Sequence, residues 1–270
     1  MLRWLVVIMK AEAPITVRYS DRFKDQGAVE YYESKEYGPE SYSSFIWKLQ
    51  QPALERIIQN FRKDRNGPVR LLDFACGTGR ILASVEGLAD EAEGIDISPQ
   101  MIDLARKKCP RTRFQTGDIL KEPGLLKNRY DLITCFRFLL NADPEIRGPV
   151  LRALRQRICE PDGLLLISVH GSSRSFRHPA ILLRRWRMRH DSPEKKARIM
   201  VNEMAPAEAR TLLWENGFHV IDQLGFGVVP HVLYRTFLRS LAARIDATLA
   251  RRQWCKAWAV DLVFICRPRA

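Results

Sequence analysis

Short apolar runs alternate with segments of helical periodicity along most of the chain. Four runs have the length and composition of buried strands: VRLLDFA (69–75), AEGIDI (92–97), YDLITCF (130–136) and GLLLISV (163–169). Further predicted strands are TRFQTGD (112–118), FHVIDQL (218–224) and AWAVDLVFI (257–265), and predicted helices cover 79–86, 99–109, 144–159 and 207–216. This order of elements predicts one domain with a mostly parallel sheet and helices on both faces.

In such a sheet, ligands bind beyond the carboxyl ends of the strands. We therefore expect the chemistry at 74–79 and at the strand ends marked by Asp96, Asp118, Phe136 and His170. The glycines of DFACGTG (73–79) stand between a strand and a helix, where the backbone can approach a ligand and the helix offers free N–H groups.

A dinucleotide-binding fingerprint would need a third glycine at position 82, where Leu82 stands, and this disfavours NAD and FAD. Asp96 closes the second strand, where a carboxylate can accept hydrogen bonds from both hydroxyls of a ribose. The pattern therefore predicts a nucleoside cofactor without a pyrophosphate.

Four segments in this order resemble the motifs of class I S-adenosylmethionine-dependent methyltransferases. LLDFACGTGR resembles motif I, GIDIS the ribose motif, TGDI the adenine motif and YDLITC the fourth-strand motif, and LLWENGF is similar to the run into strand six. The resemblance covers roughly residues 42–267. It implies a Rossmann-like α/β fold with seven strands in the order 3-2-1-4-5-7-6, the last antiparallel, and S-adenosyl-L-methionine as cofactor.

The resemblance also implies roles for single residues. Asp96 would bind the ribose, Asp118 the adenine amino group with Ile119 packed on the ring, and Asp73 would lie near the amino-acid end. Each acid has a structural alternative: Asp73 could fix the loop, Asp96 could be a solvated strand end and Asp118 could cap a turn. The family often has glycine at Ala75, and we expect alanine to be small enough for binding. The expected cofactor-binding set is Asp73, Ala75, Cys76, Gly77, Gly79, Asp96, Ile97, Asp118, Ile119 and Cys135.

Candidate catalytic residues are few. His170 follows the fifth strand and could deprotonate an acceptor hydroxyl, although a loop histidine bonded to backbone is the more common situation. We expect Cys135 to pack, because the proline-cysteine nucleophile pattern is absent, as is the asparagine-proline-proline-aromatic signature of amino methylation. Six widely spaced cysteines without CxxC and five histidines without a ligand pattern predict neither a metal site nor disulfides.

The first forty residues combine a short apolar run with several tyrosines. The apolar run after Trp4 is five residues long and reaches Lys10, which is too short for a signal peptide or a membrane span and predicts a cytoplasmic address. An edge strand, an interfacial anchor or a start at Met9 would also explain it. Five tyrosines either form a lid over the sulfonium or pack the segment on the sheet: Tyr19, Tyr31, Tyr32, Tyr37 and Tyr42. We treat 1–40 as an amino-terminal segment or lid and 41–270 as the methyltransferase domain.

The net charge of +13 is concentrated near the carboxyl end. Residues 171–270 hold 18 of the 44 basic side chains and 8 of the 31 acidic ones. Two insertions, 171–206 and 228–256, are predicted to form a helical cap over the mouth of the site. The first has six arginines and no acid between Arg174 and Arg189, and the second has a helical segment at 232–252. Its apolar stripe is Leu233, Phe237, Leu241, Ile245 and Leu249.

A basic cap can be a solvated surface, or it can meet an anionic membrane, a lipid-linked acceptor or nucleic acid, which is the least favoured partner. We interpret the chain as an enzyme that methylates a small-molecule, sugar or lipid-linked acceptor, preferably on oxygen, in the cytoplasm or at the membrane surface. The alternatives are an RNA or protein methyltransferase and a non-catalytic protein that binds the cofactor.

Overall fold

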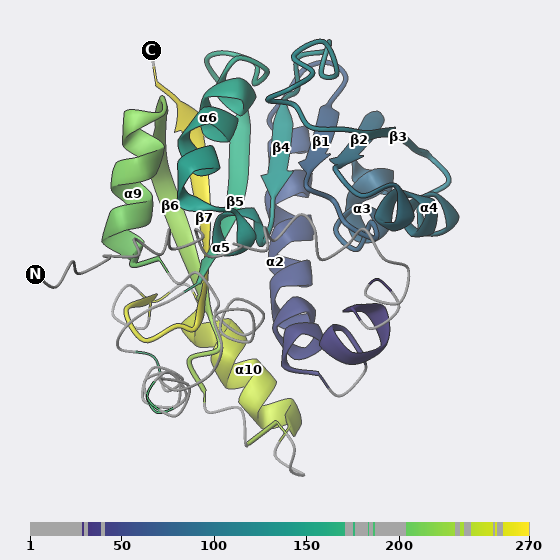
Figure 1. Ribbon diagram of the computed structural model, residues 1–270. Coiled ribbons are helices and arrows are strands. Elements are labelled where there is room, and N and C mark those ends of the chain that lie inside the picture. The colour runs from purple at the N-terminus through teal and green to yellow at the C-terminus, as the bar shows by residue number, and fades with distance from the viewer. Residues whose placement is uncertain are drawn as a thin grey trace, which may run out of the picture.

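The computed structural model describes residues 29, 32–38, 41–170, 175, 183, 186, 204–229, 233–234, 239–250, 252 and 256–269. A seven-stranded sheet in the order β3-β2-β1-β4-β5-β7-β6 forms its centre (Figure 1). The strands are β1 (Arg70–Phe74), β2 (Glu91–Asp96), β3 (Thr112–Thr116), β4 (Leu132–Cys135), β5 (Leu164–His170), β6 (Phe218–Phe226) and β7 (Asp261–Pro268). The strand order implied by the resemblance is confirmed.

Strands β1 to β5 are parallel, and β7 lies antiparallel between β5 and β6. The register of β5 and β7 runs from Leu165 opposite Cys266 to His170 opposite Asp261. The central strands are buried on both faces, which explains why they are mostly apolar in the sequence. The predicted α/β class is therefore confirmed.

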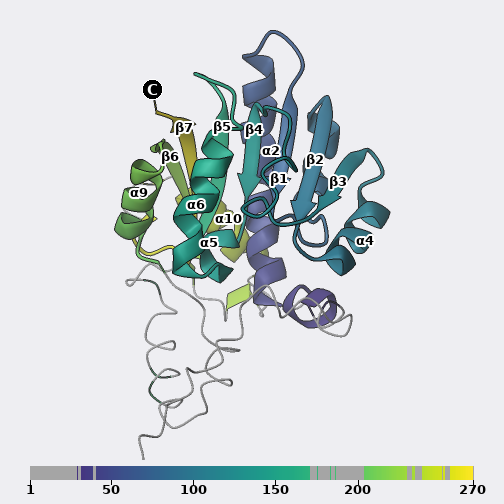
Figure 2. The same ribbon diagram turned by 45° about the horizontal axis from the view of Figure 1, so that its top comes forward.

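Helices cover both faces of the sheet. On one face are α2 (Tyr42–Lys63), α3 (Leu82–Val85) and α4 (Pro99–Lys108), and on the other are α5 (Phe138–Asn141), α6 (Pro144–Arg155) and α9 (Pro206–Glu215). Figure 2 shows α5, α6 and α9 in front of the sheet and α2 behind it. Successive strand residues point to opposite faces, so Leu71 enters the α2 core and Leu72 the α6 core.

Several helix boundaries differ from the prediction. The helix predicted at 79–86 is reduced to α3, because the glycine loop continues as turns to Ile81. The helix predicted at 144–159 ends at Arg155, and the segment predicted as helical at 232–252 contains α10 (Arg239–Leu249). Helix α2 was not predicted; the Ser41 hydroxyl caps it by accepting from the Ser44 N–H at 3.1 Å.

The parallel strands direct their carboxyl ends toward the lower edge of the sheet in Figure 1, where α10 also lies. Most of the insertion at 171–206, including the arginine-rich stretch 174–189, falls outside the described residues. Within the described part of the chain, no helix combines the length and the apolarity that a membrane crossing requires.

Candidate cofactor site

The loop after β1 turns sharply through left-handed backbone conformations. The φ angles are 55° at Ala75, 54° at Gly77 and 78° at Gly79. A Cβ on Gly79 would lie 3.0 Å from the Cβ of Ala105, so glycine allows the loop to pack on α4. A Cβ on Gly77 would meet nothing within 4 Å, so this glycine borders open space. The left-handed φ of Ala75 also explains why glycine is common at this position in the family.

Asp96, at the end of β2, joins the glycine loop to the second strand. Its carboxylate accepts from the Gly77 N–H at 2.8 Å and from the Ser98 N–H at 2.9 Å. Burial raises the pKa of Asp96 above its usual range. Asp96 is therefore a partly buried acid that shapes two loops and not a solvated strand end. Each carboxylate oxygen can accept a further hydrogen bond.

Asp73 and Arg80 bring opposite charges to the same loop. Asp73 is 1% exposed; its Oδ1 accepts from the Thr134 hydroxyl at 2.7 Å. Its Oδ2 and the Nε of Arg80 are both buried, and neither has a hydrogen-bond partner among the described residues. Burial raises the pKa of Asp73 to about 7, although the charge of Arg80 opposes this shift. An orphaned acceptor and an orphaned donor at one place suit a ligand that carries both charges.

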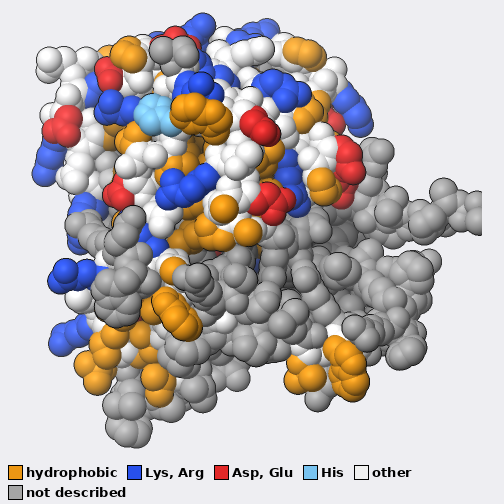
Figure 3. Space-filling view, turned by 90° about the vertical axis from the view of Figure 1, so that its left-hand side faces the viewer, with side chains coloured by type: hydrophobic (Ala, Val, Ile, Leu, Met, Phe, Trp, Pro, Cys, Tyr) orange, Lys and Arg blue, Asp and Glu red, His pale blue; other side chains and the backbone are white. Residues whose placement is uncertain are grey.

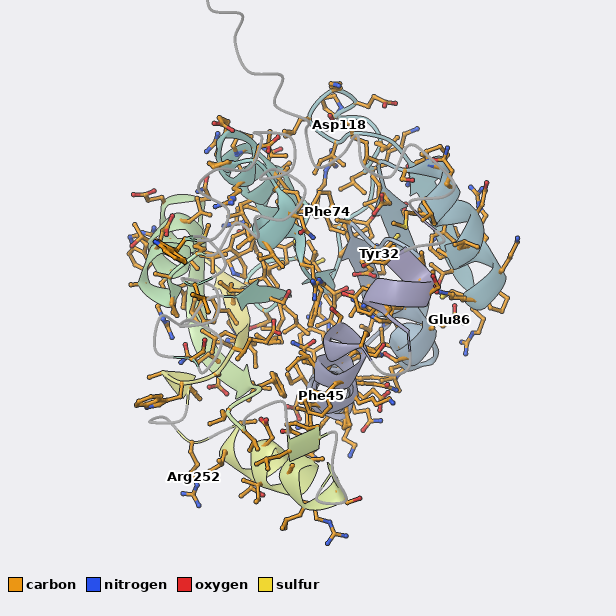
Figure 4. The ribbon with its side chains drawn as sticks, turned by 60° about the horizontal axis from the view of Figure 1, so that its bottom comes forward. Tyr32, Phe45, Phe74, Glu86, Asp118 and Arg252 are labelled. Carbon is orange, nitrogen blue, oxygen red and sulfur yellow. The ribbon has the colours of Figure 1, made fainter. Side chains whose placement is uncertain are left out.

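A short helical turn, Tyr32–Glu36, crosses the glycine loop from the amino-terminal side. The Glu33 carboxylate accepts from the Thr78 hydroxyl and pairs with Lys108 Nζ at 2.7 Å. Tyr32 lines the same cavity as Asp73 and Gly77, and Figure 4 shows the turn that carries it at the carboxyl edge of the sheet. The predicted tyrosine-rich segment thus lies on the glycine loop in its described part, 32–38.

Aromatic rings hold the same segment on Arg80. The Arg80 guanidinium carbon lies 3.6 Å from the ring centre of Tyr37 and 5.5 Å from that of Trp47. The Ser44 hydroxyl donates to the Tyr37 carbonyl at 2.6 Å, which ties the segment to the first turn of α2. The amino-terminal segment, α2 and the glycine loop therefore form one packed unit.

The cavity at the glycine loop is small. Its volume is about 30 Å³, the share of one water molecule in the liquid, whereas small-molecule sites enclose about 300–1,000 Å³. An enclosed space of this size holds only one end of a nucleoside cofactor. The lining residues are Tyr32, Asp73, Ala75, Cys76, Gly77, Thr78, Arg80, Ile81 and Phe136.

The candidate residues that follow β2 and β3 differ in their exposure to solvent. Asp118 accepts from the Leu120 N–H at 3.0 Å, so it caps its own turn. Ile119 is 7% exposed and belongs to the core under α6, whereas Ile97, directly after β2, is 46% exposed. The structure thus brings Ile97 to the surface beside Asp96.

The ends of β4 and β5 hold the remaining candidates, Cys135 and His170, and one further residue, Arg137. Cys135 is fully buried, and burial raises the pKa of its thiol well above the usual range, as expected for a packing residue. Arg137, at φ 63°, donates its backbone N–H to the Ser168 hydroxyl at 2.6 Å. His170 pairs with Asp261 through β5 and β7, and its side chain lies outside the described part of the structure.

A larger hollow of about 860 Å³ lies on β2 and β3, away from the glycine loop. Its buried acid, Glu93, accepts from the Tyr130 hydroxyl at 2.6 Å and from the Gln115 amide. Because these neutral donors already satisfy the carboxylate, we regard Glu93 as a structural acid.

The cofactor-binding set expected from the sequence omits several residues that line the cavity. Arg80 directly follows Gly79, so its place in the motif was a usable signal, and Tyr32 belongs to the noted tyrosine cluster. Thr78 and Phe136 lie within or beside the quoted motifs. Glu33 carries no local signal, because its partners lie 45 and 75 residues away.

Comparison with known proteins agrees with this geometry. A family model described as a methyltransferase domain matches residues 46–223. The demethylmenaquinone methyltransferase of Deinococcus radiodurans is 38% identical over 108 residues, which are 38% of this chain and 43% of that protein. The enzyme of the same name from Tropheryma whipplei strain Twist is 29% identical over 161 residues, 58% of this chain and 62% of that protein. The chain thus spans less than two-thirds of these relatives.

Solved structures share the fold at low identity. Magnesium protoporphyrin IX methyltransferase from Synechocystis PCC 6803 with bound SAH superimposes with a TM-score of 0.60 at 16% identity, covering 93% of this chain and 97% of the other. A SAM-dependent methyltransferase from Archaeoglobus fulgidus gives 0.58 at 17% identity, covering 88% and 98%. The matched family model, the strand order and the glycine loop beside Asp96 together show that the chain belongs to the S-adenosylmethionine-dependent methyltransferases of class I.

Proposed function

We propose that this protein transfers the methyl group of S-adenosylmethionine to a small, apolar acceptor. The observation that carries the proposal is the pair of orphaned groups at one cavity, Asp73 Oδ2 and Arg80 Nε. An amino-acid group presents an ammonium and a carboxylate, so the cofactor's amino-acid end would satisfy both orphaned atoms.

The other expected contacts follow from the same geometry. The free lone pairs of Asp96 would accept the ribose hydroxyls, and the open side of Gly77 leaves room for the cofactor to lie against the loop. Ile97, being exposed beside Asp96, would cover the adenine ring in place of Ile119. Asp118 could receive the adenine amino group on the oxygen that does not cap the turn.

The bound cofactor supplies an already activated methyl group, so the chain mainly has to align an acceptor with it. The face of Phe136 and the ring of Tyr32 line the cavity and would stabilise a nearby sulfonium charge. We propose oxygen as the acceptor atom, with His170 as the group that takes its proton. The named relatives act on demethylmenaquinone, which supports an apolar ring compound as acceptor.

Two substitutions, Arg80→Met and Asp96→Ala, and two ligands test the proposed cofactor contacts. S-adenosylhomocysteine carries the amino-acid end, whereas 5′-methylthioadenosine lacks it. We expect Arg80→Met to weaken binding of the first ligand about tenfold to a hundredfold, as for a lost charge-assisted hydrogen bond, and to leave the second unchanged. Asp96→Ala should weaken both ligands, because both contain ribose. Calorimetry without added metal provides the dissociation constants.

The chemistry is tested by incubating labelled S-adenosylmethionine with a panel of quinols, phenols, sugars, total RNA and peptides. Transfer to a quinol or phenol oxygen supports the proposal, whereas transfer to RNA or peptide supports the other enzyme class. Cofactor binding without transfer to any acceptor would indicate a non-catalytic binding protein. If neither cofactor form produces heat or a thermal shift, the proposal fails at its first step.

A further inference from the structure

Helix α10 turns two of its three large apolar side chains, Leu241 and Ile245, outward, while Leu249 packs against the core. Leu241 and Ile245 are 54% and 42% exposed, whereas Ala242, Asp246 and Ala250 on its inner side are nearly or fully buried. An amphipathic helix of a monomeric protein normally has the opposite arrangement, with large apolar residues facing the core. The outer face of α10, defined by Leu241, Arg244, Ile245 and Thr248, therefore keeps apolar area in contact with water at a free-energy cost.

The structure holds α10 in this orientation. Asp246 accepts from the Gly227 N–H at 3.1 Å and from the Tyr234 hydroxyl at 2.6 Å. The ring of Tyr234 packs on Phe45 of α2, with 3.6 Å between the ring centres. A rotation that buried Leu241 would break the hydrogen bonds of Asp246, so the exposure of the outer face is built into the fold.

The exposed charge along the described part of this helix has one sign. Between positions 239 and 252 the only acid is Asp246, which is fully buried, while Arg244 and Arg252 are exposed. Trp258, in the turn that follows, is 46% exposed. Apolar side chains flanked by arginines are typical of helices that lie in the interface of an anionic bilayer.

The position of the helix agrees with its composition. In Figure 3, hydrophobic and basic side chains are drawn at the lower end of the molecule, where Figure 1 places α10, and no acidic side chain is drawn there. The same end carries the carboxyl edge of the sheet and the glycine loop. A surface that met this end would therefore face the entrance of the proposed active site.

We propose that the outer face of α10 docks the protein on an anionic lipid bilayer, with the active-site end of the sheet toward the lipid. A second copy of the chain is a poorer occupant, because a symmetric contact would bring Arg244 and Arg252 of both copies together. The bilayer supplies both an apolar layer for Leu241 and Ile245 and phosphates for the arginines. The proposal is independent of which acceptor is methylated.

Vesicle sedimentation of the full chain tests this. Vesicles of phosphatidylcholine alone are compared with vesicles that also contain phosphatidylglycerol, at low and physiological salt. We expect binding to the anionic vesicles only, weaker at higher salt because the exposed charges are screened over about 8–10 Å. Leu241→Ser with Ile245→Ser should weaken binding about tenfold or more, since two aliphatic side chains lose their burial in the interface.

The matched control replaces Trp214 and Ile221, which are 53% and 46% exposed on α9 and β6, by serine. This control should bind as the unchanged protein does. A second variant, Arg244→Glu with Arg252→Glu, leaves the apolar residues in place and should lose at least about fivefold per charge. Circular dichroism and the shift of melting temperature with S-adenosylhomocysteine show that each variant is folded.

Several results would overturn the proposal: no sedimentation with anionic vesicles, equal binding to neutral vesicles, or equal losses in the control and the α10 variants. Concentration-dependent dimerisation that the α10 serine variant abolishes would assign the face to a second copy. If excess RNA displaces the protein from the vesicles and the protein also binds RNA directly, the outer face of α10 would be assigned to nucleic acid. All these measurements omit methyl transfer, so failure of the proposed enzymatic function would leave their outcome unaffected.

Discussion

Ala75 and Arg137 are non-glycine residues with left-handed backbones, at φ 55° and 63°, and they follow the neighbouring strands β1 and β4. This conformation costs an L-residue about 1–2 kcal/mol, and it persists where surrounding contacts hold it. The Arg137 N–H is bonded to Ser168, and the N–H of Cys76, next to Ala75, is bonded to the Ile95 carbonyl at 3.0 Å. Backbone strain is therefore concentrated at the strand ends that border the candidate site.

We predict that Ala75→Gly stabilises the protein. Relief of left-handed strain, about 1–2 kcal/mol, exceeds the entropy that glycine adds to the unfolded chain, about 0.4–1 kcal/mol, so a gain of about 0.5–1 kcal/mol is expected. Urea unfolding measures it. Ala247→Gly, on the exposed side of α10, is the control and should lower the free energy of unfolding by about 1 kcal/mol. A loss of similar size at both positions would contradict the strain argument.

The buried Asp73 predicts a pH dependence. Its pKa of about 7 in the folded protein lies above the ordinary value of 3.8, so the folded state binds the proton more tightly than the unfolded state. The free energy of unfolding should therefore fall as pH rises from about 4 to about 7 and change little above that. Asp73→Asn, which cannot ionise, should remove this fall. Urea unfolding of both proteins across the pH range checks the prediction.

The same titration should affect ligand binding in the opposite direction. A protonated amino group prefers the carboxylate of Asp73, so affinity for S-adenosylhomocysteine should increase as pH rises through about 7. Asp73→Asn should bind with a flatter pH profile, and 5′-methylthioadenosine should show no such increase with either protein. An identical increase for both ligands would place the titrating group elsewhere.

At the scale of elements, the segment 32–38 lies against the glycine loop and contributes Tyr32 to the lining of its cavity. Glu33 reaches across it to Thr78 of the glycine loop and to Lys108 at the end of α4, and Tyr37 packs on Arg80. These contacts are partly exposed, and such ion pairs contribute about 0–1 kcal/mol. We therefore infer that the ion pair of Glu33 is a weak part of the packing that holds the segment on the glycine loop, and that cofactor binding can displace it.

We predict that Glu33→Gln opens the segment more readily. Loss of the ion pair with Lys108 should speed association of S-adenosylhomocysteine about two- to fivefold, which corresponds to the free energy of one exposed pair. Stopped-flow tryptophan fluorescence can follow association, since Trp47 lies near Arg80. Glu55→Gln on α2, whose partner is Gln51, should associate at the unchanged rate. Slower association of Glu33→Gln would show that Glu33 helps to build the site instead of closing it.

At the scale of the whole molecule, the last strand, β7, lies within the sheet, between β5 and β6, and not at its edge. β7 hydrogen-bonds to both β5 and β6, so the end of the chain joins the part of the sheet that carries α9 and α10 to the parallel part that carries the glycine loop. Phe264 of β7 is fully buried, and Arg210 of α9 lies over its ring at 5.0 Å. Stability of the whole domain should depend on this strand.

Phe264→Ala should lower the free energy of unfolding by about 3–5 kcal/mol, the cost of a large cavity in a packed core. Ile221→Ala, on the exposed side of β6, should change it by less than about 0.5 kcal/mol. Chemical denaturation followed by both fluorescence and circular dichroism measures the two values and shows whether the sheet unfolds as one unit. A small effect at Phe264, or two separate transitions, would contradict this view of β7.

The sequence by itself determined the sheet class, the place of the glycine loop and the acid at the end of β2. These features are local: a short, mostly apolar run specifies a buried strand, and Gly77 and Gly79 are needed where the backbone turns to the left-handed side. The strand order 3-2-1-4-5-7-6 came from the family resemblance carried by those motifs.

Only the tertiary structure decided which neighbours meet. It placed Ile97 at the surface and Ile119 in the core, shortened the helix after the glycine loop to α3, and turned Leu241 and Ile245 of α10 outward. It also brought Glu33 to Thr78 and Lys108, across 45 and 75 residues. Periodicity shows that a helix or strand has two sides, but which side is covered depends on residues distant in the chain, and these are brought together only by packing.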